Sequence, residues 1–174
     1  MNLLDLLDSA GGAQSLGKIS SNLGLDESKT QSLMGALTPA LMGAFQKQAK
    51  SQDGLNSFIN ALQKGNHQQY LENPATMTAP ETVADGNNIL GHLLGSKDVS
   101  RNVAAQAAQS TGIDASLIKQ ALPFIASLAM GAMSKNSDGG KSLSSSGSAG
   151  GLLDSLMGED FGVDDVLNLA KKFF

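Results

Sequence analysis

A short motif that recurs three times constrains the fold of this chain more than any other feature. Glycine, an aliphatic residue and aspartate follow one another, each time just ahead of a run with helical spacing of apolar residues. Glycine can end a helix in the left-handed conformation, and aspartate can cap the first amides of the next helix. We therefore expect each triplet to join two helices. The defining residues of these joints are Gly24, Asp26, Gly112, Asp114, Gly162 and Asp164.

The surroundings of the first two triplets repeat at an offset of 88 positions. Residues 24–47 overlay residues 112–135, and both segments carry apolar side chains at helical spacing, with no convincing strand elsewhere. Chance similarity between Leu- and Ala-rich helices is the alternative explanation. An internal repeat determines how a chain is assembled. The sequence thus predicts an all-α fold, a duplicated helical bundle of two pseudo-repeats.

Composition shifts divide the chain into five expected segments. A polar stretch with Pro74 and Pro80 separates the two repeats, and a Gly/Ser-rich stretch follows the second one. Interior prolines, Pro39 and Pro123, predict kinks or breaks in the long helix of each repeat. The expected segments are a first helical repeat over 1–65, an inter-repeat loop over 66–88, a second helical repeat over 89–135, a flexible Gly/Ser linker over 136–151 and a C-terminal amphipathic helical segment over 152–174.

The C-terminal segment has the clearest amphipathic pattern in the chain. Acidic residues begin it and two lysines, Lys171 and Lys172, come near its end, an order that complements the helix dipole. The linker has an r.m.s. span on the order of 20 Å, so the segment can dock in cis or in trans. Trans docking would produce dimers or longer assemblies. We expect the interaction face of this helix to consist of Val163, Val166, Leu167, Ala170, Phe173 and Phe174.

The residue inventory argues against catalysis and metal binding. The chain has no cysteine, and neither His67 nor His92 has a second histidine at ligand spacing. A nucleophile elbow and the calcium-loop order of aspartates are also absent from the sequence. We therefore expect no enzymatic activity, no catalytic residue, no cofactor and no metal.

Charge and hydropathy bear on the other partner classes. The net charge is −4, the lysines are scattered, and one arginine and one tyrosine are present. This pattern does not favour nucleic acid, although the segment near Gly112 has a helix-turn-helix outline. The longest apolar run, residues 121–133, is shorter than the roughly 20 residues of a membrane span. Two lysines beside the terminal aromatics support membrane-surface contact poorly. We expect a cytoplasmic protein.

Several segments resemble a known bacterial family. They are the decapeptide from Gly86 to Gly95, the sequence Thr111-Gly112-Ile113-Asp114, the helix that contains Leu122-Pro123, and the C-terminal Asp-Asp-Val-Leu-x-Leu-Ala-Lys-Lys-Phe-Phe. They are similar to the family numbered 937 among domains of unknown function, which is related to YidB-like proteins. The resemblance implies an all-helical bacterial protein and brings no activity, substrate or catalytic residue with it.

These observations predict a non-enzymatic protein-interaction or self-assembly module. It would use apolar grooves and its tethered C-terminal helix, and its partner would be a second copy or another protein. Nucleic-acid binding through the segment near Gly112 is the alternative.

Overall fold

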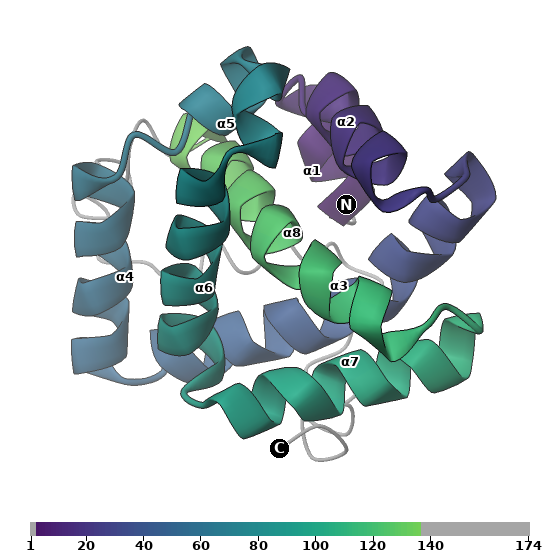
Figure 1. Cartoon of the computed structure of the whole chain (residues 1–174). Helices are drawn as coiled ribbons and strands as arrows, with labels where there is room; N and C mark the ends of the chain where they lie inside the picture. Colours follow the sequence, from purple (N-terminus) through teal and green to yellow (C-terminus); the bar gives the residue numbers. More distant parts are fainter. Residues whose placement is uncertain (1–2, 137–174) are drawn as a thin grey trace.

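The computed structural model describes residues 3–136, and within that range all regular structure is helical (Figure 1). The prediction of an all-α fold is confirmed. In chain order the elements are α1 (Leu3–Ser9), α2 (Ala13–Leu23), α3 (Glu27–Ala49), α4 (Gln52–Lys64), α5 (Gln69–Glu72), the 3-10 helix η1 (Pro74–Thr78), α6 (Pro80–Leu94), α7 (Lys97–Thr111) and α8 (Ala115–Asn136).

Helix α8 is the centre of the fold. It runs through the middle of the bundle, and α1, α2, α4, α5, α6 and α7 all contact it (Figure 1). Every residue from 121 to 128 is buried, so apolar and small side chains cover the whole circumference of this stretch. Among the described helices, α8 alone is long and apolar enough to cross a membrane by length and composition, and 67% of its apolar window is buried inside the protein.

The first two triplets lie between helices and have similar local geometry. Gly24 and Gly112 follow α2 and α7 with φ angles of 65° and 71°, a left-handed conformation that glycine adopts without strain. The Asp26 carboxylate accepts a hydrogen bond from the Lys29 amide at 2.8 Å. The Asp114 carboxylate accepts one from the Ser116 amide at 2.7 Å. Both helices that follow therefore begin with a side-chain cap. Gly162 and Asp164 lie outside the described residues.

The two halves of the bundle nevertheless pack differently. Helices α3 and α8 begin at Glu27 and Ala115, positions related by the predicted offset. Helix α7 packs closely on α8, its successor, whereas α2 packs mainly on η1 and α8 and makes few contacts with α3. Equivalent stretches of sequence thus have different neighbours, and the duplication stays a prediction.

The predicted inter-repeat loop over 66–88 is wrong as a description of local structure. This stretch contains α5, η1 and the first half of α6, and it buries Tyr70, Leu71 and Met77. Pro80 occupies the first turn of α6, where the missing amide hydrogen is not needed, so it begins a helix. The polar composition concealed the helical spacing of the buried α6 residues Thr82, Gly86, Ile89 and Leu90.

The interior prolines do not break their helices. Helices α3 and α8 continue through Pro39 and Pro123. Each proline removes the hydrogen bond to the carbonyl four residues earlier, which belongs to Gly35 or Lys119. Both of these residues are exposed, so water can bond to the carbonyl that loses its partner.

Candidate functional site: a cleft between α4 and α6

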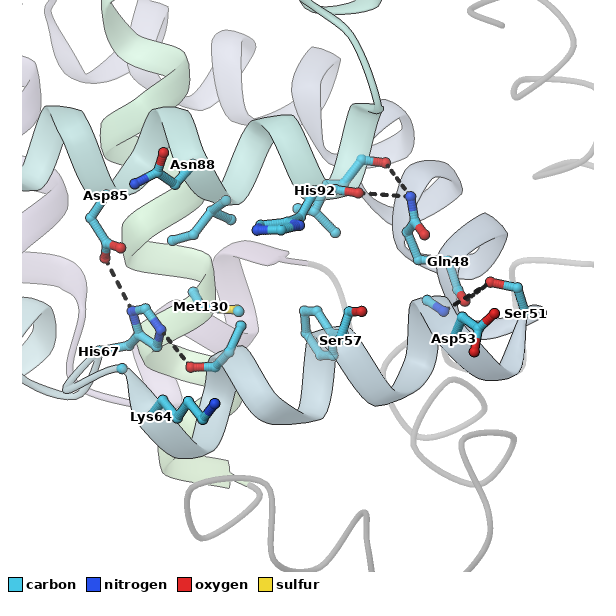
Figure 2. A pocket seen from close by; sticks show the side chains of 16 residues that line it. Gln48, Ser51, Asp53, Ser57, Lys64, His67, Asp85, Asn88, His92 and Met130 are labelled. Carbon is cyan, nitrogen blue, oxygen red and sulfur yellow. Dashed lines mark hydrogen bonds and ion pairs between the residues drawn. The ribbon is translucent and has the colours of Figure 1, made fainter.

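A cleft with a volume of about 600 Å³ opens between α4 and α6 (Figure 2). Met130 of α8 lies at its base, and Gln48 of α3 closes one end by donating from its side-chain amide to the His92 carbonyl at 2.7 Å. The rim is mostly polar, and the side chains toward the base are apolar. The lining residues are Gln48, Ser51, Asp53, Gly54, Ser57, Phe58, Ala61, Lys64, Gly65, His67, Asp85, Asn88, Ile89, His92, Leu93 and Met130.

A second, smaller hollow adjoins this cleft and is almost wholly apolar. The two hollows share Phe58, Ile89, Leu93 and Met130, so they lie side by side, and we treat the second as the apolar end of the cleft. Four of its side chains, Met42, Leu93, Ala129 and Met133, are partly accessible, and the others are buried. We call this lining the apolar strip; it consists of Leu41, Met42, Phe45, Phe58, Ile89, Leu93, Ala126, Ala129, Met130 and Met133.

Local sequence signals position the α4 wall. The Ser51 hydroxyl caps α4 by accepting from the Gly54 amide at 3.1 Å, and Gly65 follows the last turn. Phe58 is buried against Phe45 of α3, with ring centroids 4.5 Å apart in an edge-to-face arrangement. Such aromatic pairs contribute about 1 kcal/mol beyond their buried area. This pair holds α4 on α3, and Phe58 itself lines the cleft.

The α6 wall approaches α8 closely because residue 86 is glycine. A Cβ atom on Gly86 would overlap the Pro123 carbonyl oxygen and lie 2.5 Å from the Pro123 carbonyl carbon. With hydrogen alone at this position, the two helix backbones can touch. The contact brings Ile89 and Leu93 of α6 beside Met130 at the base of the cleft.

One end of the cleft contains a polar cluster of His67, Tyr70 and Asp85, in which His67 and Tyr70 are buried and the Asp85 side chain is 34% exposed (Figure 2 shows His67 and Asp85). His67 is 4% exposed, and its Nε2 lies 3.0 Å from the Ala61 carbonyl oxygen. The Tyr70 hydroxyl donates to Asp85 Oδ2 at 2.7 Å. His67 Nδ1 lies 3.2 Å from the same Oδ2, yet it has no well-aligned hydrogen-bond partner. At this distance the two groups are in contact, but the direction is poor for a hydrogen bond.

The cluster is better suited to holding elements together than to acid-base chemistry. Burial first, and then the hydrogen bond and negative charge of Asp85, raise the pKa of Tyr70 above its usual value. The phenol therefore stays protonated at neutral pH. The Ser15 hydroxyl of α2 donates to the Tyr70 carbonyl at 2.5 Å, so the cluster links α2, α5 and α6. Within residues 3–136 no group of three His, Asp or Glu side chains could hold a metal ion.

Only some of the residues that we predicted to be functional lie within the part of the chain that the structure describes. The predicted interaction face, from Val163 to Phe174, lies outside it. Gly24, Asp26, Gly112 and Asp114 form helix joints and do not line the cleft. His92 lies on the exposed rim of the cleft. The sequence interpretation overlooked the polar cluster, because no short spacing relates Asp85 to the other two members.

Two of the three comparisons with known proteins found no match: no curated protein and no solved structure matches the chain. A family model does match, and the matched residues are 5–136. They span nearly all of the helices described above and stop where α8 ends. The chain belongs to the family described as bacterial protein of unknown function, DUF937.

Proposed function

We propose that this protein is a non-enzymatic interaction module whose cleft receives an amphipathic helix, and that residues 152–174 of the chain supply that helix. The observation that carries the proposal is the apolar strip beside an open cleft between two helices, in which Met42, Leu93, Ala129 and Met133 are partly accessible. Recognition of a helix in a groove uses such a strip, with anchors at i, i+3, i+4 and i+7 on the incoming helix. The stripe from Val163 to Phe174 has this spacing.

The dimensions of the cleft and of the segment agree. At 1.5 Å rise per residue, α4 is about 20 Å long and α6 about 22 Å. The stripe from Val163 to Phe174, as a helix, would be about 18 Å long. A volume of about 600 Å³ accommodates several large apolar side chains and lies within the range of specific binding sites.

The chain leaves the bundle beside the cleft. Near the end of α8, the Ser134 carbonyl accepts a hydrogen bond from the Gln68 side chain at 3.5 Å, next to His67 of the cleft. The predicted linker has an r.m.s. span on the order of 20 Å, comparable with the length of the cleft. The segment can therefore reach its own cleft or that of a second copy. Docking between copies makes the protein a self-assembly module, and docking within one copy closes the cleft until another helix displaces the segment.

Nucleic-acid binding receives no support from the geometry. A helix-turn-helix protein inserts its second helix into the major groove. In this chain the joint at Gly112 connects α7 to α8, so the second helix is α8, which lies at the centre of the bundle and is mostly buried. Residues 121–128, the middle of this helix, are buried on every side, and its exposed residues are confined to the two ends.

A binding measurement tests the proposal. A labelled peptide of residues 159–174 should bind saturably to a chain that ends at residue 151, as measured by fluorescence anisotropy. Leu93→Glu places a charge in the apolar strip and should weaken binding at least tenfold, because an unpaired carboxylate would be desolvated. Leu117→Glu is the matched control, since Leu117 is a partly buried leucine of α8 that does not line the cleft. Absence of binding to the shortened chain contradicts the proposal.

Light scattering then distinguishes the two docking modes. Docking between copies predicts a molar mass above that of the monomer for the intact chain, and a monomer after deletion of residues 152–174. A monomer both before and after the deletion contradicts self-assembly and assigns the segment to its own cleft.

A further inference from the structure

We propose that the C-terminal segment docks in one direction, antiparallel to α4, with Asp164 and Asp165 beside Lys64 and with Lys171 and Lys172 beside Asp53. The inference rests on the proposed function and adds the orientation of the docked helix. Three observations carry it: the charges at the two ends of the cleft, their separation, and the place where α8 ends.

The unpaired charges at the two ends of the cleft are opposite. If the histidines are left aside, the charged residues that line it are Asp53, Lys64 and Asp85. Asp85 already contacts His67 and Tyr70. Asp53 and Lys64 are exposed, and neither forms an ion pair within the described part of the chain. Figure 2 shows them toward opposite ends of α4. An incoming helix therefore meets an available cation at one end and an available anion at the other.

The charges of the segment are separated by a matching distance. Asp53 and Lys64 are about 16 Å apart along α4, from the helical rise. In a helical segment, the pair Asp164 and Asp165 lies about 10 Å from the pair Lys171 and Lys172. The long lysine side chains can cover the remaining few ångströms, because their charged ends extend well beyond the helix surface. The reverse orientation would place like charges together at both ends.

The end of α8 favours the same orientation. Helix α8 ends beside Gln68 and His67, which follow the C-terminus of α4 and so lie at the Lys64 end of the cleft. In docking within one copy, the shortest path for the linker leads to this end. Its N-terminal aspartates then meet Lys64, and the helix runs toward Asp53. Lys50, which caps α3 near the far end, is exposed but does not line the cleft.

Cysteine cross-linking in the full chain tests the direction, because the natural sequence contains no cysteine. One cysteine replaces an exposed residue at either end of α4, as Gln52→Cys or Asn66→Cys. The other is placed at either end of the segment, as Gly162→Cys or as a cysteine added after Phe174. A short thiol cross-linker should join Gly162→Cys to Asn66→Cys, and the added cysteine to Gln52→Cys, at least fivefold more efficiently than the two opposite pairs.

The outcomes of this experiment separate the two proposals. Preferential cross-linking of the opposite pairs, or equal cross-linking of all four, overturns the orientation and leaves docking intact. No cross-linking in any pair, in chains whose circular dichroism remains helical, overturns docking as well. As a second measurement, Lys64→Glu in the antiparallel orientation should weaken binding of the peptide about two- to fivefold, the range of exposed ion pairs. Strengthened binding would show that the lysines of the segment lie at that end.

Discussion

Replacement of Gly86 by alanine tests the close contact between α6 and α8 that forms one wall of the cleft. The new Cβ would lie 2.5 Å from the Pro123 carbonyl carbon, whereas ordinary contact requires 3.4–4 Å. Both groups belong to helix backbones, so no side-chain rotation can relieve the overlap. The helices must separate by about 1 Å, and a gap of that size forfeits a quarter to a half of each dispersion contact along the interface.

Two opposing terms determine the size of the effect. Overpacking of a buried site costs about 1–3 kcal/mol, and we expect about 3 kcal/mol at Gly86 because only backbone can move. Alanine is about 1 kcal/mol more favourable than glycine inside a helix. The net expectation for Gly86→Ala is therefore a loss of about 2 kcal/mol in the free energy of unfolding.

Gly91→Ala is the matched control for this prediction. Gly91 lies in the same helix, and its added Cβ would meet nothing within 4 Å, so this variant should gain the helical preference alone, about 1 kcal/mol. Urea unfolding, followed by circular dichroism, measures both variants. A difference of about 3 kcal/mol between them isolates the helix contact, because the helical preference cancels. Equal shifts for the two variants would refute the close approach of α6 to α8.

Three further predictions concern individual groups. Because the pKa of Tyr70 is raised, its contribution to the free energy of unfolding is complete below pH 10, the ordinary value, and is lost as the pH rises above it. Tyr70 is the single tyrosine, so tyrosinate absorbance should appear only with unfolding. Reversible ionisation near pH 10 in the folded chain would be inconsistent with its burial. Hydrogen bonds from the Ser116 hydroxyl and amide lower the pKa of Asp114. Its contribution to the free energy of unfolding is therefore present above pH 3.8 and is lost as the pH falls below that value. Ser116→Ala should raise that pKa toward the ordinary value in a carboxyl NMR titration, and an unchanged value would exclude the hydroxyl as its cause. Gly112→Ala should lower the free energy of unfolding by about 1 kcal/mol, because alanine is strained at a φ of 71°; no loss in urea unfolding would show that the joint adopts another conformation.

Local signals made the helical fold predictable. Glycine followed two residues later by aspartate encodes the end of one helix and the start of the next, as at Gly24 and Asp26, without reference to the rest of the chain. Prediction of local structure failed where one residue type is common both in loops and in helices. Proline is common both in loops and in the first turn of a helix, and Pro80 occupies the first turn of α6. The polar stretch that precedes it buries Tyr70 through contacts with distant helices, which no local pattern encodes.

The candidate site depends almost wholly on tertiary structure. The cleft forms because Phe58 packs on α3 and Gly86 packs on α8, contacts between residues that are far apart in sequence. Nothing in the sequence pairs His67 with Asp85, which belong to different elements. The amphipathic stripe of the C-terminal segment is evident from its spacing, but the surface that it would cover is formed only by the packing of four helices.

The most direct test of the proposed docking is methyl NMR of the full chain labelled at methionine. Three of the seven methionines line the cleft, and two fully buried methionines that do not line it serve as internal references. The cleft methionines are Met42, Met130 and Met133, and the references are Met34 and Met77. Docking predicts that Leu167→Asp, which disrupts the stripe of the segment, shifts the methyl signals of the three cleft methionines and leaves the two reference signals in place. Unchanged signals from the cleft would contradict it.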